Sequence, residues 1–203
     1  MRLPSDEAGR GQAVVLLHAR PADRTMWRAV LPVLADAGCR AIALDLPGYG
    51  EAPAAGHGVL APWSDVLETL DDLAADRFVL AGNSLGALVA LQVAVTVRDR
   101  VDALVLVGYR PHDQPPSAEL QAAWAGERTA LAAGDIERAV QAGVAAWTSP
   151  GAPAEIKEHA ASMLRHDLEL QLTTGEVKHA GDPLSADPAA RSVRRCTRTR
   201  RVW

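Results

Sequence analysis

Ser84 is the residue of this sequence whose surroundings best suit a reactive side chain. It lies at the centre of GNSLG, residues 82–86, which has the pattern G-x-S-x-G. An apolar run precedes the motif and a long apolar segment follows it, so a strand is expected to turn sharply into a helix with the serine at the turn. Larger residues at the two glycines would collide with the helix or the neighbouring strand, and the helix N-terminus favours developing negative charge. The pattern predicts a nucleophilic serine, and the alternative is a glycine-rich turn with an ordinary serine.

Two further motifs follow apolar runs earlier in the chain. The first, LLHARP at residues 16–21, contains His18. The second, DLPGYG at residues 45–50, begins with Asp45. A histidine at the end of a strand is also a common structural residue, so His18 by itself does not indicate catalysis.

The elements that must position these motifs follow from the pattern of apolar residues. Short, nearly continuous apolar runs at 14–17, 41–44, 78–81 and 103–107 are typical of strands that are buried on both faces of a parallel sheet. Helical spacing alternates with them, in a segment that starts at Trp27 and stops at Gly38, in another that starts at Trp63, and in residues 85–97. This order predicts a three-layer α/β/α fold with a parallel sheet of about four strands.

The character of the chain changes after Gly108. Three prolines in residues 110–116 indicate a loop, and residues 117–171 are Ala-rich and helical in pattern, with breaks near Gly134 and at residues 149–151. We therefore expect an α/β core over residues 1–109, a helical cap insertion over 110–175 and an irregular basic tail over 176–203.

The order and spacing of the three motifs resemble the α/β-hydrolase family, in particular its branch with H-G-x-P, D-x-P-G-x-G and G-x-S-x-G-G. The resemblance is close over residues 13–109 and looser through the helical region to about residue 175. It implies a partial α/β-hydrolase fold with a helical cap. It also implies an enzyme that acts on small acyl substrates without a metal or an organic cofactor.

The resemblance further implies roles for individual residues. Ser84 would attack an acyl carbonyl, and the backbone N–H groups of Leu85 and Arg20 would form the oxyanion hole. His18 would hold the oxyanion loop in shape and would not be the general base. Asp45 would begin a loop that shapes the floor of the site.

Three positions within the motifs depart from the family pattern. Ala19 replaces the glycine of H-G and restricts the loop if this position needs a positive φ. Ala87 replaces the second glycine of the elbow and is expected to be harmless on a helix. Arg20 stands where the family often has an apolar residue, and its side chain either favours an anionic substrate or extends into solvent.

A nucleophilic serine also needs a general base and an acid that orients it. In the family both follow strands beyond the cap, yet residues 176–203 contain no apolar run of four. Asp113 is a weak candidate for the acid, and the candidates for the base are His112, His159, His166 and His179. We therefore expect a truncated chain with a foreign basic end, without room for an opening antiparallel hairpin in residues 1–12. The run 103–107 would then form an apolar sheet edge that invites association.

The charge distribution argues against some functions. Residues 191–203 hold six of the 21 basic residues and none of the 25 acidic ones, which leaves a net charge of −10 on the rest of the chain. An acidic body is not typical of a nucleic-acid-binding protein. No apolar run is long enough to span a membrane, and two cysteines without metal-ligand spacing favour a cytoplasmic protein.

Two functions remain compatible with these residues. The first is hydrolysis of small carboxylic esters, lactones or related acyl compounds through an acyl-Ser84 intermediate; the elbow also resembles that of hydrolases that cleave carbon–carbon bonds. A serine at this place argues against haloalkane dehalogenases and epoxide hydrolases. The second is a catalytically incomplete remnant that binds acyl ligands without converting them. Trp124, Trp147 and Arg20 either line the acyl pocket or serve packing and the surface.

Overall fold

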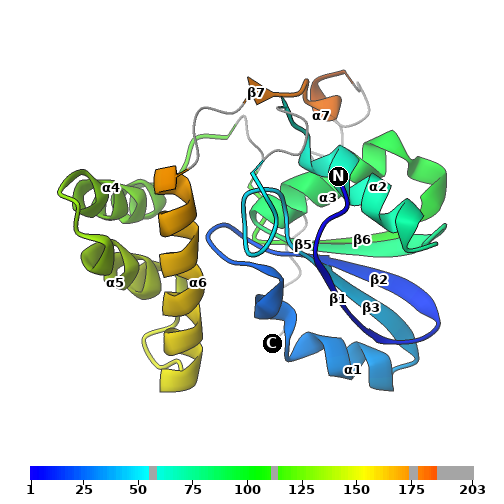
Figure 1. Ribbon diagram of the computed structural model, residues 1–203, viewed down its shortest axis with the longest axis horizontal. Coiled ribbons are helices and arrows are strands. Elements are labelled where there is room, and N and C mark those ends of the chain that lie inside the picture. Colours follow the sequence, from blue (N-terminus) through cyan, green and yellow to red (C-terminus); the bar gives the residue numbers. More distant parts are fainter. Residues whose placement is uncertain (55–58, 111–113, 174–177, 187–203) are drawn as a thin grey trace.

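The centre of the computed structural model is a five-stranded sheet with the strand order β1-β3-β2-β5-β6 (Figure 1). The structure describes residues 1–54, 59–110, 114–173 and 178–186. The strands of this sheet are β1 (Ser5–Gly9), β2 (Gln12–Leu17), β3 (Cys39–Leu44), β5 (Phe78–Asn83) and β6 (Val101–Val107). All neighbouring pairs are parallel except β1 and β3. The parallel α/β sheet that the four apolar runs predict is therefore confirmed.

Strand β1 is the part of the sheet that sequence reasoning missed. It pairs antiparallel with β3, with Ser5 opposite Leu44 and Gly9 opposite Arg40. We expected no room for an antiparallel hairpin in residues 1–12; the structure places there one strand, which pairs with β3 and not with β2. The sequence SDEAG shows no apolar alternation, and an edge strand needs none, because backbone hydrogen bonds to one neighbour are enough to hold it.

Helices cover both faces of the sheet and make three layers (Figure 1). On one face α1 (Val30–Asp36) packs against β1 and β3. On the other face α3 (Leu85–Thr96) packs against β2, β5 and β6, and α2 (Pro62–Asp72) packs against α3. The main core lies between these layers, and its fully buried members include Val15, Leu17, Ile42, Leu44, Phe78 and Leu80.

The first predicted helix is shorter than its apolar spacing suggested. Trp27 ends a separate 3₁₀ turn, η1 (Arg24–Trp27), and α1 begins only at Val30. Pro32 gives the physical reason, because a proline has no N–H and is tolerated only in the first turn of a helix. A second 3₁₀ turn, η2 (Arg98–Arg100), connects α3 to β6.

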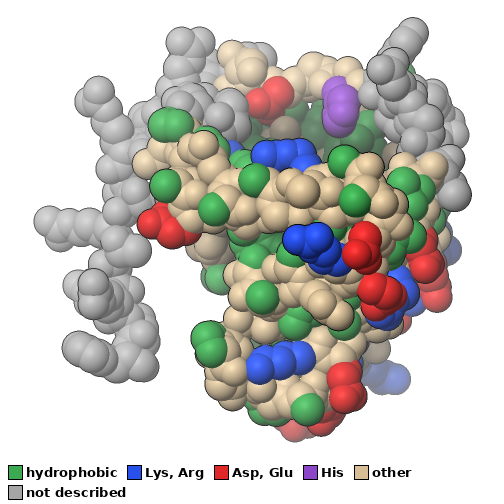
Figure 2. Space-filling model, turned by 90° about the vertical axis from the view of Figure 1, so that its left-hand side faces the viewer, with side chains coloured by type: hydrophobic (Ala, Val, Ile, Leu, Met, Phe, Trp, Pro, Cys, Tyr) green, Lys and Arg blue, Asp and Glu red, His purple; other side chains and the backbone are tan. Residues whose placement is uncertain are grey.

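Three helices form a second layer of packing beside the sheet, and we call them the cap. They are α4 (Ala118–Ala132), α5 (Ile136–Trp147) and α6 (Ala154–Thr173), with breaks at the two predicted places. Gly134 lies in the turn between α4 and α5 and has a φ of +73°. The side chain of Asp135 caps α5 by accepting a hydrogen bond from the N–H of Arg138. The cap has its own apolar cluster, made by Ala130, Ala139, Val140, Leu164 and Leu168. On its outer face hydrophobic side chains are scattered among charged ones (Figure 2).

The remaining elements close the top of the molecule as it is drawn in Figure 1. The short strand β7 (Lys178–His179) pairs with β4 (Val59–Leu60), and α7 (Pro183–Ala186) packs against α3 by burying Leu184 beside Leu91. The described part of the expected irregular tail is therefore partly structured.

Strand β6 is the outer strand of the sheet on the side away from β1. Val105 and Val107 are 47% and 45% exposed, because their side chains lie on a stretch of the sheet that α1 does not reach. The apolar edge predicted for this run is confirmed. Among the described helices, none is long and apolar enough to cross a membrane.

Candidate active site

The turn from β5 into α3 holds Ser84 in a strained conformation. Its φ of +50° and ψ of −105° are unusual for a residue with a side chain, and Ala74 is the one other non-glycine residue with a positive φ in the described part of the chain. The N–H of Ser84 donates to the carbonyl of Val107 at 2.9 Å, which ties the turn to the end of β6. The side chain is exposed and does not cap α3. The hydroxyl is therefore presented above the sheet at a helix N-terminus.

The two glycines around Ser84 are required by close backbone packing. A Cβ at Gly82 would lie 2.2 Å from the carbonyl oxygen of Gly86, within the first turn of α3. A Cβ at Gly86 would lie 2.2 Å from the carbonyl oxygen of Leu17, at the end of the neighbouring strand β2. Both contacts are shorter than any real Cβ tolerates, so the collisions expected from the sequence are present in the structure.

Two backbone N–H groups beside the elbow are available to an incoming ligand. Leu85 is the first residue of α3, so its N–H has no partner within the helix. Arg20 lies in the loop after β2, and its N–H has no acceptor among the described residues. Gly86 packs against Leu17 and His18, which brings the start of α3 against the beginning of that loop. The role of the Leu85 and Arg20 N–H groups as an oxyanion hole stays a prediction.

His18 is fully buried and uses both ring nitrogens to connect two loops. Its Nε2 accepts a hydrogen bond from the N–H of Leu46 at 2.9 Å, and its Nδ1 donates to the carbonyl of Ala19 at 2.9 Å. The ring also contacts Tyr49 edge to face, with 5.2 Å between centroids. Burial lowers the pKa of His18 and keeps the ring neutral. These contacts fit a residue that shapes the oxyanion loop and leave no nitrogen for a general base.

The departures at Ala19 and Ala87 are accommodated without strain. Ala19 does not have a positive φ, so the concern about its Cβ does not apply. Its N–H points to the sulfur of Met26 at 3.5 Å. Ala87 is buried in the first turn of α3.

Asp45 is a structural residue of the loop after β3. Its carboxylate is fully buried, forms an ion pair with Arg24, and accepts hydrogen bonds from the N–H groups of Arg24 at 2.8 Å and Glu51 at 2.9 Å. Gly50 has a φ of +55°, and a Cβ there would lie 2.3 Å from a carboxylate oxygen of Asp45. All donors to this carboxylate come from the protein itself, which fits the role of shaping the floor of the site.

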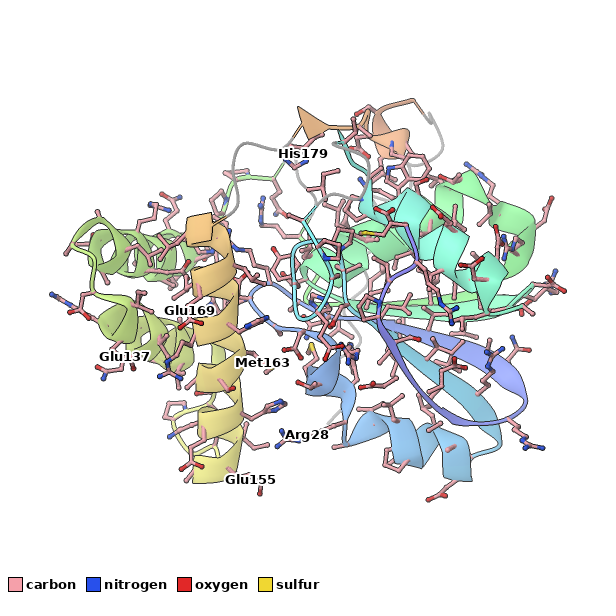
Figure 3. All side chains as sticks on the ribbon, in the orientation of Figure 1. Arg28, Glu137, Glu155, Met163, Glu169 and His179 are labelled. Atoms are coloured by element: carbon pink, nitrogen blue, oxygen red, sulfur yellow. The ribbon has the colours of Figure 1, made fainter. Side chains whose placement is uncertain are left out.

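The histidines expected to share a face of the last cap helix hold the cap against the core. His159 forms a hydrogen bond with the hydroxyl of Thr25 at 2.8 Å, and His166 donates to the carbonyl of Gly50 at 2.8 Å. Burial and then the nearby charge of Arg28 lower the pKa of His159. From the same face Met163 points toward the core, and Arg28 of the core points toward Glu155 (Figure 3).

A cleft of about 520 Å³ lies along this boundary between η1 and α6. Thr25, Arg28, His159 and His166 line it, and Ser84 does not. We therefore regard it as part of the boundary between cap and core and not as the acyl site.

No described side chain is hydrogen-bonded to the hydroxyl of Ser84, so the structure does not provide a triad acid or base among the residues it describes. His179 is exposed on β7. His112 and Asp113 lie outside the described residues. Trp124 is half-buried on α4, and Trp147 is 44% exposed on α5, which packs mainly against α4 and α6. In the described part of the chain, no three His, Cys, Asp or Glu side chains are placed to hold a metal ion.

A group of polar residues that sequence reasoning missed lies where the cap meets the oxyanion loop. We call it the acidic recess, and it consists of Arg20, Tyr49, Glu127, Asp167 and Gln171. Glu127 and Asp167 are 8% and 3% exposed, although both are acidic. Arg20 forms an ion pair with Glu127 at 3.5 Å, and half of its side chain remains exposed to solvent. A possible signal was the position of Asp167, one turn after Met163 on the inward face of α6.

Comparisons with known proteins agree with this architecture. A family profile described as alpha/beta hydrolase fold matches residues 12–172. The structure is similar to that of a thermophilic esterase from Thermogutta terrifontis, with a TM-score of 0.68 and 27% identity over 93% of this chain and 71% of that one.

Two curated proteins show similarity over the core. A pimeloyl-[acyl-carrier protein] methyl ester esterase of Legionella pneumophila is 32% identical over 55% of this chain and 44% of its own length. Epoxide hydrolase 3 of Siraitia grosvenorii is 38% identical over 48% of this chain and 32% of its own length. The chain thus spans less than half the length of these relatives, and their names differ in substrate. The fold, the elbow and the family profile together show that this chain belongs to the α/β-hydrolase fold family.

Proposed function

We propose that this protein hydrolyses small carboxylic esters, lactones or related acyl substrates through a covalent acyl-Ser84 intermediate. The observation that carries the proposal is the elbow, where an exposed hydroxyl lies on a strained turn at the N-terminus of α3, next to the N–H of Leu85. The similarity to proteins named as esterases supports ester substrates, and the serine at the elbow argues against epoxide hydrolysis.

The chemistry would proceed in two steps. The oxygen of Ser84 attacks the acyl carbon, its proton passes to a general base, and the N–H groups of Leu85 and Arg20 donate to the oxyanion. The alcohol then leaves with a proton, and water releases the acid from the serine. We further propose that residues 110–175 act as a cap over this site, and that the protein is cytoplasmic, since Cys39 is free.

The proposal is tested by hydrolysis of 4-nitrophenyl acetate, with Ser84→Ala as the variant and Ser149→Ala, an exposed serine after α5, as the matched control. We expect Ser84→Ala to lose at least about 100-fold in rate, because the covalent intermediate can no longer form, and Ser149→Ala to keep the rate. Mass spectrometry after a fluorophosphonate should place the adduct on Ser84. Equal rates for wild type and Ser84→Ala would rule out a serine hydrolase.

A second candidate is an acyl-ligand-binding protein without turnover. It is favoured by one observation, namely that no described side chain is positioned to take the proton from Ser84. Under this alternative, wild type and Ser84→Ala are equally inactive and unlabelled, yet acyl compounds still raise the thermal unfolding temperature.

A further inference from the structure

Among the described residues, the acidic recess brings two buried carboxylates near one guanidinium group. Glu127 on α4 and Asp167 on α6 both face Arg20, which lies in the oxyanion loop. Arg20 is half-exposed, and it contacts Glu127 and the side-chain oxygen of Gln171 at 3.5 Å each. One guanidinium thus serves two buried carboxylates, and neither contact is short. Buried charges normally have close partners, so this arrangement is unusual.

Asp167 shows most directly that a hydrogen-bond donor is missing. Its Oδ2 accepts a hydrogen bond from Gln171 at 2.7 Å, but its Oδ1 is buried and has no partner among the described residues. Burial raises the pKa of Asp167, the charge of Glu127 adds to this effect, and Arg20 and His166 oppose it. His166 itself is turned toward the carbonyl of Gly50. An unmade hydrogen bond to a buried carboxylate oxygen costs free energy that a suitable ligand would recover.

Tyr49 is a partly buried neighbour of the two carboxylates of the recess. Burial, together with the nearby carboxylate of Asp167, raises the pKa of Tyr49 to about 12. Its phenol therefore stays protonated. Tyr49 also contacts His18, so the recess adjoins the base of the oxyanion loop.

We propose that the acidic recess binds a positively charged nitrogen of the substrate, such as a protonated amine, and thereby selects amino-substituted acyl compounds over carboxylated ones. The ammonium group would enter between the cap and the oxyanion loop, donate to Oδ1 of Asp167 and offset the surplus negative charge. From the sequence alone, the charge of Arg20 could favour an anionic substrate. The ion pair between Arg20 and Glu127 instead favours a cationic group at this place. The inference rests on the proposed function for its substrate class but makes a separate statement about binding.

The test uses three methyl esters that differ at the far end of the acyl chain: methyl 6-aminohexanoate, methyl heptanoate and monomethyl adipate. In the full chain carrying Ser84→Ala, which cannot form an acyl-enzyme, we expect the amine to bind about tenfold more tightly than the neutral ester, and the adipate most weakly. Isothermal titration calorimetry measures the three dissociation constants at pH 7.5. Equal affinities, no binding of the amine, or tighter binding of the adipate would overturn the proposal.

Variants of the recess assign the preference to its residues. Asp167→Asn and, independently, Glu127→Gln should each reduce the ratio of amine to neutral affinity by about threefold or more. Glu155→Gln, an exposed acid of the same helix α6, is the control that should keep the ratio. A ratio that survives both recess variants contradicts the proposal. If Ser84 proves dispensable for hydrolysis but the binding preference holds, only the proposed function fails.

Discussion

The elbow and the acidic recess are stabilised in different ways. At the elbow, Gly86 is required because a larger residue would collide with the neighbouring backbone. At the acidic recess, the buried side chain of Glu127 is held by an ion pair with one cation, Arg20. Gly86 packs against the carbonyl oxygen of Leu17, and the position of Ser84 follows from backbone sterics alone. The recess depends on an ion pair at 3.5 Å between residues that are more than 100 positions apart. The comparison teaches that the proposed nucleophile is held by fixed backbone contacts, while the proposed selectivity site depends on charged side chains.

The largest expected effect comes from adding one methyl group to the elbow. Gly86→Ala should lower the free energy of unfolding by about 3 kcal/mol, because its Cβ meets backbone atoms that cannot move independently. Gly126→Ala is the matched control, since Gly126 is exposed on α4 and its Cβ meets only Ala142 at 4.0 Å. There we expect a gain of about 0.5–1 kcal/mol from helix propensity. Urea unfolding measures both, and similar changes for the two variants would refute the steric account.

A smaller effect is expected when the cation of the recess is removed. Arg20→Ala should cost about 1–2 kcal/mol, because Glu127 is left buried without its partner, while the half-exposed position of Arg20 limits the loss. The double variant Arg20→Ala/Glu127→Gln should recover most of it. Arg28→Ala, whose partner Glu155 is exposed, should change stability by less than about 0.5 kcal/mol. Strict additivity of the two recess changes in urea unfolding would show that the pair is not coupled.

The smallest effect concerns the pH dependence of Asp167. Burial raises the pKa of Asp167 in the folded state above the usual value of an aspartic acid, so its contribution to stability is most favourable below that usual value and is lost as the pH rises through the raised pKa. Asp167→Asn should therefore be more stable than wild type at pH 7.5, and this gain should shrink toward pH 4. Gln171 and Arg20 offset part of the burial, which keeps the difference small. A gain that is larger at pH 4 than at pH 7.5 would contradict the assigned direction.

The features that sequence reasoning predicted are those with local causes. The G-x-S-x-G pattern, the four apolar strands and the cap breaks at Gly134 and residues 149–151 each depend on a few neighbouring residues. The strand β1 was missed because its pairing with β3 uses backbone groups and leaves no side-chain pattern. The start of α1 was predicted too early, because the prediction followed the spacing of apolar residues from Trp27 and did not take account of Pro32.

The composition of the recess could not be predicted for a different reason. Glu127 and Asp167 carry acidic side chains on α4 and α6, which also have exposed acids such as Glu119 and Glu155, and nothing local marks the buried pair. Their burial depends on how the cap lies against Arg20 and Tyr49, which are far away in the sequence. His159 and His166 illustrate the same point, since their shared helix face was foreseen but their partners Thr25 and Gly50 were not.

The exposed valines of β6 affect how all of these measurements must be made. Val105 and Val107 lie on a strand that has no second neighbour among the described strands, and such an edge can pair with the same edge of another molecule. Such pairing would raise the apparent unfolding temperature as protein concentration increases, without any change in the chemistry at Ser84. Variants should therefore be compared at one fixed protein concentration, and a dilution series of the wild type should come first.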